Sequence, residues 1–353
     1  MKVYIDGEEL SSVAITRKLK EHPEYQKTNT AEFKPNILGA LHNWKHGLGY
    51  GYGEEGQGFV NVTTSGTTGY PQRIAHSRDT IQQVVESNIK LLELNSNSKI
   101  LSMYSPRGIA WTVLSVYLAA ELDCELYIES YKGIGYVDRV HTIRPTHTLL
   151  LPNVWKALHK HRKWETLDYS SVDTLMLGSD FTPEGALDEL RQHGPRKVYN
   201  VYGSTEVPPI VLCSEEENVY TKDSIPDGCE VKLHNTQICA KWSTQDEFWV
   251  SGDCVEGTID KFTLNGRVPN MFKQDTYRVY PEQVEKTAVA LGAELALCQQ
   301  VNNKCILHYT GSIDERELEM RWSQVPRFRI RKVDEIKVDD NLKKIIRTQK
   351  FND

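Results

Sequence analysis

Residues 146–178, THTLLLPNVWKALHKHRKWETLDYSSVDTLMLG, decide the fold class of this chain. The stretch begins and ends with apolar runs, THTLLLP and DTLMLG, whose length and composition are typical of buried strands. A helix is predicted between them, starting at about Asn153. The order strand, helix, strand predicts neighbouring strands of a largely parallel sheet.

The alternation of short strands and helices continues on both sides of this stretch. Upstream, DTIQQVVESNIKLLEL (79–94) places apolar side chains on one helical face, with Ser77 or Asp79 as a candidate cap. Further strands and helices are predicted at KILSMYS (99–105), from about Ile109 to Leu122, at ELYIE (125–129), at PEGALDELRQHG (183–194) and at KVYNVYG (197–203). Together they predict an α/β fold with mainly parallel sheet layers.

The composition of the chain changes after about residue 210. Short runs of strand-like composition, separated by turn residues, predict a small β subdomain. These runs are EVKLHN (230–235), QICAKWS (237–243), EFWVSGD (247–253) and GTIDKFTLNG (257–266). Beyond GRVP (266–269), predicted helices and strands form a compact α+β unit that ends with a strand at EIKVD (335–339). We therefore expect a large N-terminal domain over residues 1–267 and a small C-terminal domain over residues 268–353.

Charge and composition exclude several classes of protein. The 353 residues include 42 basic and 48 acidic side chains, and the net charge of −6 disfavours binding of the whole protein to nucleic acid or to an anionic membrane. No apolar run has the length of a signal peptide or a membrane helix, so a cytoplasmic protein is expected. None of the 7 cysteines lies in a CxxC pair, which favours reduced thiols, and we propose no metal site from them.

The stretch TTSGTTGYPQR (63–73) crowds hydroxyl side chains and glycines into one short run. It is not a Walker A loop, because no Gly-Lys-Ser/Thr closes it. Its glycines permit unusual backbone angles, and its hydroxyls and backbone N–H groups can turn toward an anion. Taken alone, a run of this composition is more often an ordinary surface loop than a phosphate-binding loop, and both interpretations stay open at this point.

Three further stretches carry candidate chemistry. NVYGSTEV (200–207) would put a hydroxyl and a carboxylate at the carboxyl edge of a parallel sheet, where ligands of open α/β folds bind. In VSGD (250–253), followed by GR (266–267), an aspartate can accept from ribose hydroxyls and an arginine can hold them or a phosphate. The basic run KKIIR (343–347) suits polyphosphate or nucleic acid. The alternatives are an exposed strand end, a hairpin turn and a solvated tail, respectively.

The order and spacing of these motifs resemble the ANL superfamily of adenylating enzymes, which contains acyl-CoA synthetases, adenylation domains of nonribosomal peptide synthetases, and luciferases. TTSGTTGYP is similar to the family's phosphate loop, NVYGSTE to its Tyr-Gly-x-Thr-Glu motif and SGD to its Thr-Gly-Asp motif. GR followed by FKQDTYRVYPEQVE is similar to its hinge region, and LKKIIR to its terminal lysine motif. All of them lie in family order, over about residues 60–350.

The resemblance implies a two-step ligase that uses ATP and Mg²⁺ and has a mobile C-terminal lid. A carboxylic acid and ATP give an acyl-adenylate and pyrophosphate, and a nucleophile then takes the acyl group. The residues implied to bind the nucleotide are Thr63, Thr64, Ser65, Gly66, Thr67, Thr68, Gly69, Tyr202, Gly203, Asp253 and Arg267. The residues implied in catalysis are Lys344, Thr205 and Glu206, and Glu206 is also the implied Mg²⁺ ligand.

The resemblance also implies where the acid binds. YSPRGIAW (104–111) and GSDF (178–181) fall where the family has pocket residues. The candidates are therefore Arg107, Trp111, Gly178 and Ser179. Trp111 has simple core packing as its alternative. No aspartate in SPRGIAW matches the one that binds the α-amino group in amino-acid-activating members, which favours a small or aryl acid.

Four positions depart from the family's pattern: Gln72 in the phosphate loop, Pro269 at the hinge, Thr276 in place of a glycine, and Lys343 before the terminal lysine. In the family, the backbone at Thr276 lines the route of a pantetheine thiol. The use of coenzyme A (CoA) is therefore left open, and a thiol, an amine or a carrier protein stands as acceptor. The alternatives are a conventional acid–CoA ligase, and a catalytically impaired nucleotide-binding module that acts through a partner. A protein that binds nucleic acid through its basic tail is disfavoured by the acidic chain.

Overall fold

The computed structural model of the protein describes residues 2–5, 8–10, 59–63, 73–103, 109–129, 135–267, 270–274, 277–302, 304–323, 325–338, 345 and 349–351. Its main element is an eight-stranded sheet in the order β10-β9-β8-β7-β5-β6-β1-β2. These strands are β10 (Leu212–Ser214), β9 (Lys197–Tyr202), β8 (Thr174–Gly178), β7 (His147–Leu150), β5 (Lys99–Ser102), β6 (Glu125–Ile128), β1 (Lys2–Ile5) and β2 (Glu8–Leu10). The strands from β9 to β1 are parallel to one another, and the edge strands β10 and β2 are antiparallel. The prediction of an α/β fold with a mainly parallel sheet is confirmed.

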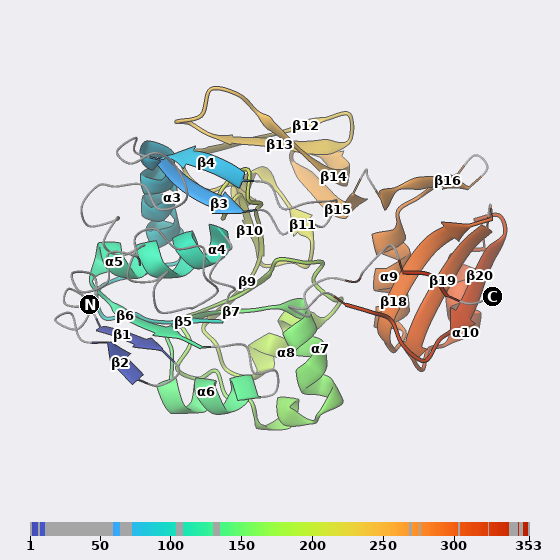
Figure 1. Ribbon diagram of the computed structural model, residues 1–353, viewed down its shortest axis with the longest axis horizontal. Helices are drawn as coiled ribbons and strands as arrows, with labels where there is room; N and C mark the ends of the chain where they lie inside the picture. Colours follow the sequence, from blue (N-terminus) through green and yellow to red (C-terminus); the bar gives the residue numbers. More distant parts are fainter. Residues whose placement is uncertain are drawn as a thin grey trace.

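Helices cover both faces of this sheet, with α3, α4 and α5 on one face and α6, α7 and α8 on the other (Figure 1). The helices are α3 (Arg78–Leu91), α4 (Ile109–Trp111), α5 (Leu118–Leu122), α6 (Tyr136–Ile143), α7 (Pro152–Lys160) and α8 (Ala186–Gln192), with short 3₁₀ turns η4 (Lys163–Thr166) and η5 (Lys222–Ser224). Between α4 and α5 the chain forms a π-helix, η2 (Thr112–Tyr117). The helix predicted from Ile109 to Leu122 is therefore continuous but widened in its middle, a feature that is frequent at functional sites.

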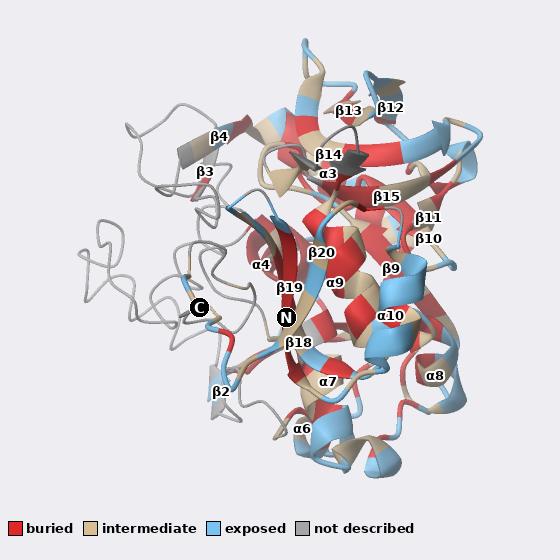
Figure 2. Ribbon diagram, turned by 90° about the vertical axis from the view of Figure 1, so that its right-hand side faces the viewer, coloured by how far each residue is buried: buried red, intermediate tan, exposed pale blue. Residues whose placement is uncertain are grey.

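The sequence pattern accounts for the way these elements pack. Every residue of β7 and β8 is buried, because both strands are central and helices cover both of their faces. The apolar face predicted for α3 is buried through Ile81, Val84 and Val85. Ser77 is the cap of that helix, since its Oγ accepts a hydrogen bond from the Thr80 N–H at 3.1 Å. Figure 2 shows β19 and much of α9 as buried, and the outer helix α10 as mainly exposed.

A second, five-stranded sheet forms the predicted small β subdomain, in the order β11-β15-β14-β13-β12. Its strands are β11 (Val219–Tyr220), β12 (Cys229–His234), β13 (Gln237–Trp242), β14 (Trp249–Thr258) and β15 (Lys261–Arg267). The prediction of one strand over residues 257–266 is wrong, because the chain turns at residues 259 and 260 between β14 and β15. A separate hairpin pairs β3 (Phe59–Thr63) with β4 (Arg73–Ser77).

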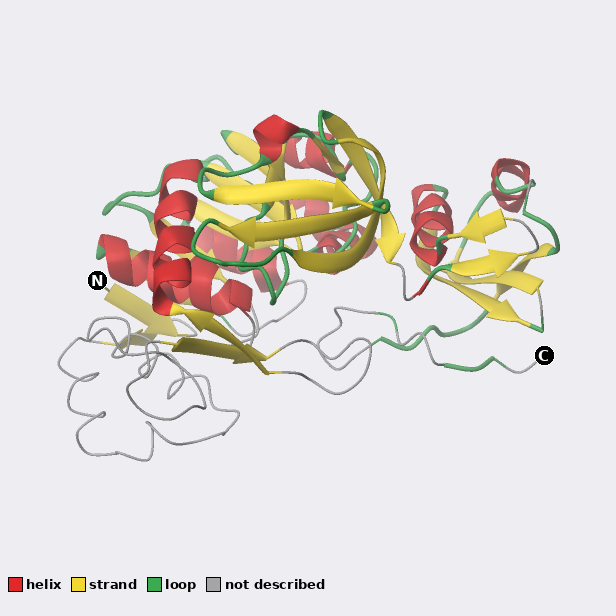
Figure 3. Cartoon of the chain, turned by 90° about the horizontal axis from the view of Figure 1, so that it is seen from above, coloured by secondary structure: helices red, strands yellow, loops and turns green. Residues whose placement is uncertain are grey.

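The C-terminal part of the chain has its own core. It contains the hairpin β16 (Phe272–Gln274) and β17 (Tyr277–Val279), the helices α9 (Pro281–Ala290) and α10 (Glu315–Arg321), and a sheet of β18 (Ala293–Val301), β19 (Lys304–Gly311) and β20 (Phe328–Lys332). Its buried cluster, which runs from Val279 to Val325, is separate from the larger cluster, which extends to Phe262. Two separate cores support the proposed division of the chain at residue 267, and Figure 3 shows the two parts side by side.

Two strand assignments in the outer parts of the chain differ from the sequence-based expectations. The strand predicted at EIKVD (335–339) is wrong, because β20 pairs with β19 in parallel register and Val338 makes only an isolated bridge to Ile345. The short strand β1, in a region without a clear pattern, extends the main sheet by pairing with β6. No helix in the described parts of the chain is both long and apolar enough to cross a membrane.

Candidate functional site

The segment Gly203–Glu206 follows β9 directly at the carboxyl edge of the main sheet. Thr205 and Glu206 are half-buried, and both lie in an irregular segment rather than in a helix. Gly203 is required by the close approach of Pro209, since a Cβ at Gly203 would lie 2.5 Å from the Pro209 Cβ. The sheet edge therefore presents a hydroxyl and a carboxylate where open α/β sheets bind ligands, as the motif NVYGSTE predicted.

The β3–β4 hairpin, which flanks residues 64–72, is joined to this segment by His76. The His76 side chain is 4% exposed, and its Nε2 lies 2.7 Å from the backbone oxygen of Thr205, 129 residues away in sequence. Burial lowers the pKa of His76, while the hydrogen bond to Thr205 and the charge of Glu206 act in the opposite direction. A neutral imidazole that donates its Nε2–H to the carbonyl fits this environment. The hydrogen bond ties the hairpin that flanks the first motif to the second motif.

Asp253 joins the third motif to the second. The Tyr202 hydroxyl donates to Oδ2 of Asp253 at 2.6 Å, and the Asp253 N–H donates to Oγ of Ser251 at 2.9 Å. Asp253 lies inside β14, directly opposite Arg267 of β15. The hairpin-turn alternative for VSGD is therefore wrong, because the turn of this hairpin lies at its other end. The structure brings Tyr202, Asp253 and the backbone of Arg267 into one place.

The C-terminal part of the chain contacts the N-terminal part beside this place. A Cβ at Gly266, the residue before Arg267, would lie 2.5 Å from Oε2 of Glu282 in α9. Farther away, Lys160 of α7 donates to Oε2 of Glu294 in β18 at 2.7 Å. Both side chains of that ion pair are about half exposed, so the pair stabilises the contact by only about 0–1 kcal/mol. Close packing at Gly266 is the tighter of the two contacts.

Two of the pocket candidates lie at the carboxyl end of β8. A Cβ at Gly178 would lie 2.6 Å from the backbone oxygen of Val201, so β8 and β9 approach each other too closely there for a side chain. Ser179 follows with φ 76°, in the left-handed region that residues other than glycine adopt only at a cost of about 1–3 kcal/mol. Strain of this kind is frequent beside binding sites. Both residues thus lie on the same sheet edge as Gly203.

Trp111, by contrast, is fully buried and belongs to the large core cluster. This placement favours the core-packing alternative for Trp111. Arg107 and Lys344 lie outside the described residues, as do Thr64, Ser65, Gly66, Thr67 and Thr68, Gly69, and the departures at Gln72, Pro269, Thr276 and Lys343. Only the backbones of Thr63 and Arg267 are described, as the ends of β3 and β15.

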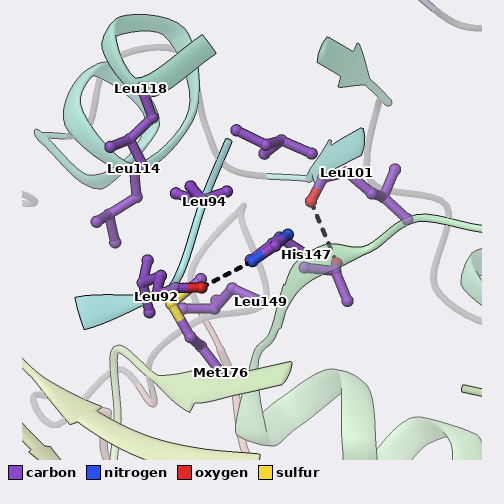
Figure 4. Close-up of a pocket in the computed structure, with 10 residues that line it drawn as sticks. Leu92, Leu94, Leu101, Leu114, Leu118, His147, Leu149 and Met176 are labelled. Atoms are coloured by element: carbon purple, nitrogen blue, oxygen red, sulfur yellow. Dashed lines mark hydrogen bonds between the residues drawn. The ribbon is translucent and has the colours of Figure 1, made fainter. Parts of the chain in front are cut away.

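A small apolar cavity lies inside the protein, and none of the motif residues lines it (Figure 4). It is lined by Leu92, Leu94, Ile100, Leu101, Leu114, Leu118, His147, Thr148, Leu149 and Met176. Its volume of about 10 Å³ leaves room for one water molecule at most. His147 bonds through Nε2 to the Leu92 carbonyl at 2.8 Å, and Thr148 donates to the Leu101 carbonyl at 3.2 Å. The cavity is a packing space of the core and too small for an acid substrate.

His76 was not among the candidates, because a lone histidine in a strand gives no signal in the sequence. Its role follows from the position of β4 next to Thr205, which the sequence does not give. Among the described residues, no group of three or more His, Cys, Asp or Glu side chains could hold a metal ion. Mg²⁺ does not require such a group, since it is usually bound by one or two carboxylates together with substrate phosphates. The single half-buried carboxylate of Glu206 fits that mode of binding.

Comparisons with known proteins agree with this arrangement of motifs. The 2-succinylbenzoate–CoA ligase of Escherichia coli is 24% identical over 257 residues, which cover 66% of this chain and 52% of that relative. The fold resembles the anthranilate CoA ligase AuaEII in complex with anthranoyl-AMP, with a TM-score of 0.70 and 15% identity over 82% of this chain and 66% of that one. It also resembles the o-succinylbenzoate CoA synthetase of Bacillus subtilis in complex with ATP and magnesium ion, with a TM-score of 0.68 and 15% identity over 82% of this chain and 69% of that one.

These structural likenesses show the fold. The chain spans between 29% and 52% of the length of the curated relatives that it matches. The model of the AMP-binding enzyme family matches residues 59–256, a range that contains the hairpin, the Tyr202–Glu206 segment and Asp253. Because that match covers more than half of the chain and agrees with the motifs, this protein belongs to the AMP-binding enzyme family, among the adenylating enzymes of the ANL superfamily.

Proposed function

We propose that the chain is an AMP-forming acid ligase, which activates a carboxylic acid with ATP. A carboxylate oxygen attacks the α-phosphorus, the bond to the bridging oxygen breaks, and pyrophosphate leaves with the electron pair. The product is an acyl-adenylate, whose acyl group passes to an acceptor. The observation that carries the proposal is that the segment at the carboxyl end of β9 bonds both to the hairpin that flanks the first motif, through His76–Thr205, and to the third motif in β14, through Tyr202–Asp253.

The adenosine half of ATP is assigned to Tyr202, Gly203, Asp253 and Arg267. The Asp253 carboxylate already accepts from the Tyr202 hydroxyl, so it is oriented to accept from ribose hydroxyls as well. The Tyr202 ring would lie along the adenine. Arg267, opposite Asp253 in the β14–β15 pairing, would clamp the ribose or a phosphate.

The phosphates are assigned to the loop between β3 and β4 and to Thr205. Hydroxyls and backbone N–H groups of Thr63 to Gly69 would hold the β- and γ-phosphates, and the Thr205 hydroxyl would contact the α-phosphate. The hydrogen bond from His76 holds the hairpin next to Thr205. Mg²⁺ held by Glu206 would neutralise charge on the phosphates. Lys344 would place its ammonium between the carboxylate and the α-phosphate, as a mobile point charge can.

A small or aryl acid is the proposed substrate class. The relatives described above are ligases of 2-succinylbenzoate and anthranilate, which are aryl acids. Gly178 and Ser179 would form the wall of the acid pocket beside β9, with Arg107 as a further candidate. Trp111 would act only as a buried support. The same relatives are CoA ligases, which favours CoA as acceptor, whereas Thr276 disfavours it, and an amine or a carrier protein is the alternative.

ATP–pyrophosphate exchange across a panel of aliphatic, aryl and amino acids tests the proposal. Exchange with one class of acid is expected for the wild type. Asp253→Ala should raise the KM for ATP roughly 10- to 100-fold, the equivalent of one hydrogen bond to a charged group at about 1.5–3 kcal/mol. Glu206→Ala should abolish exchange. Asp260→Ala is the matched control, because Asp260 is an exposed carboxylate at the far end of the same hairpin.

The outcomes separate the alternatives. Exchange with no acid, despite measurable binding of ATP, would contradict the enzyme and support the nucleotide-binding module. Exchange that survives Glu206→Ala would overturn the assigned Mg²⁺ ligand. Consumption of CoA in the presence of the activated acid would identify a conventional acid–CoA ligase. Adenylate formation without CoA consumption would direct the search to an amine or carrier protein.

A further inference from the structure

Strand β12 forms one edge of the five-stranded sheet, where it pairs with β13. Figure 1 shows this strand at the upper rim of the molecule. β12 and β13 are joined by a two-residue turn, in which Asn235 and Thr236 both have a positive φ, at 49° and 63°. In a hairpin of this kind the residues that flank the turn, His234 and Gln237, exchange backbone hydrogen bonds. Every second residue of β12, counted back from His234, therefore bonds to β13.

The residues between them direct their backbones away from the sheet. Glu230 and Lys232 are at positions that bond to β13, so Val231 and Leu233 direct their N–H and C=O groups outward. The part of the chain that the structure describes forms no hydrogen bond to these outward groups. β12 thus has an open edge, of the kind that can pair with a strand of another chain.

The side chains of β12 differ between its two faces. Glu230 and Lys232 are exposed on one face, whereas Val231 and Leu233 are half-buried against the core on the other. Glu230 also lies 3.4 Å from the ammonium of Lys241 in β13. A lysine on an edge strand disfavours pairing with most other strands. A carboxylate two residues away can offset that lysine in an antiparallel copy of the same strand.

We propose that β12 is a contact between two copies of this chain, which pair antiparallel about a two-fold axis at Val231. In this register Glu230 of each copy lies opposite Lys232 of the other, so opposite charges meet on the exposed face. Val231 exchanges both backbone hydrogen bonds with Val231 of the second copy, and the Leu233 N–H donates to the Cys229 oxygen of that copy. The half-buried side chains of Val231 and Leu233 are covered on the other face.

Other registers fail on charge or on hydrogen bonding. An axis at Glu230 would place this carboxylate opposite itself, and an axis at Lys232 would place two ammonium groups opposite each other. An axis between two residues would put the outward groups of Val231 opposite a residue whose own groups bond to β13. The pairing ends at Cys229, because its N–H already donates to the Pro226 oxygen at 3.1 Å. The register at Val231 satisfies both requirements.

Sedimentation equilibrium of the full chain over a wide range of concentration tests the contact. The average mass of the wild type should approach that of two chains as the concentration rises. The equilibrium should be weak, because one strand pair buries less area than a standard interface. Glu230→Lys places like charges opposite each other and should raise the dissociation constant roughly 10-fold or more. Glu319→Lys, the same change at an exposed position of α10, is the matched control and should leave it unchanged.

An exchange of the two charges decides the register. The double variant Glu230→Lys with Lys232→Glu restores opposite charges across the axis and should recover most of the association of the wild type. A double variant that associates as poorly as Glu230→Lys alone would overturn the register. A wild type that stays monomeric at every concentration would overturn the contact, and an extended segment of another protein would then be the occupant to test.

Amide hydrogen exchange measures the backbone side of the contact. The N–H groups of Val231 and Leu233 should exchange more slowly as the protein concentration rises. Val231→Pro removes an outward donor, which an edge strand tolerates, and should abolish association with the charges retained. Thermal unfolding checks its fold, and Glu230→Lys keeps the test valid if Val231→Pro does not fold. Association that survives both variants would overturn the inference, because another surface would then join the copies. The result is independent of the proposed function, since none of these readouts requires pyrophosphate exchange.

Discussion

His76 and His147 are both buried, and each ring holds a backbone carbonyl through Nε2, at 2.7 Å from Thr205 and 2.8 Å from Leu92. Burial lowers the pKa of both. They differ in what surrounds them. His76 lies in strand β4 of the hairpin and bonds to the Thr205–Glu206 segment, whereas His147 lies beside an apolar cavity in the core.

The same kind of hydrogen bond therefore serves two purposes in this protein. At His147 it satisfies a carbonyl at the end of α3, so the bond contributes to folding alone. At His76 it joins the β3–β4 hairpin to Thr205, 129 residues away, so it contributes both to folding and to the geometry of the candidate site. Substitutions at the two positions should therefore separate stability from activity.

The largest effect on stability is expected for His147→Ala. The substitution leaves the buried Leu92 carbonyl with only the longer bond from Oγ1 of Thr174 at 3.4 Å and enlarges an existing cavity, so the free energy of unfolding should fall by about 2–4 kcal/mol. Urea unfolding measures the loss. Pyrophosphate exchange per folded molecule should equal that of the wild type, and a slower folded enzyme would show that this core region also shapes the site.

His76→Ala should lower both the free energy of unfolding and the rate of pyrophosphate exchange. The loss of one buried hydrogen bond should reduce the free energy of unfolding by about 1–3 kcal/mol. The freed hairpin should slow pyrophosphate exchange roughly 10- to 100-fold. His76→Gln retains a side-chain N–H donor and should recover part of the rate. If the folded His76→Ala enzyme is as fast as the wild type, the bond to Thr205 has no part in the site.

The stability of the wild type should fall below pH 6.5, the unperturbed pKa of both histidines. The folded state holds each ring neutral, with its pKa lowered, while the unfolded chain binds a proton near pH 6.5. The contribution is complete above pH 6.5 and is lost as the pH falls toward the lower folded pKa, by up to about 1.4 kcal/mol per pH unit for each ring.

Urea midpoints between pH 7.5 and pH 5 measure this dependence, with the His147→Ala variant beside the wild type. The free energy of unfolding should depend on pH roughly half as steeply in the variant as in the wild type. For His147 the charges of Asp173 and Glu93 oppose the effect of burial, and that of Arg196 adds to it. Glu93 itself does not titrate in this window, because the hydrogen bond from Lys197 lowers its pKa to about 2. An identical slope in the two proteins would exclude His147 as a source.

The main sheet could be predicted from the sequence because its strands are apolar runs between amphipathic helices, as in β7, α7 and β8. The sheet edge that bears Thr205 and Glu206 could be predicted for the same reason, since the carboxyl ends of parallel strands lie together. β1 could not be predicted, because four residues next to charged neighbours carry no periodic signal. The strand expected at EIKVD has an alternating pattern, but β20 occupies the place beside β19.

Contacts between segments far apart in the chain could not be predicted from the sequence. The Tyr202–Asp253 bond joins strands of two different sheets, 51 residues apart, and no local pattern encodes that pairing. The family resemblance supplied both residues, but it did not supply the hydrogen bond between them. His76 had neither kind of signal, because its role depends on where β4 lies relative to Thr205.

The smallest effect is expected at Ser77, the residue after His76. Its Oγ caps α3 by accepting from the Thr80 N–H, so Ser77→Ala should cost about 1 kcal/mol of stability, and Ser77→Asp should cost less. Exchange should be unchanged, because β4 and the bond from His76 to Thr205 are retained. Thermal unfolding and pyrophosphate exchange check both. If Ser77→Ala slows exchange as much as His76→Ala does, attachment of the hairpin to α3 orders the site, and the contrast between the two histidines would lose its basis.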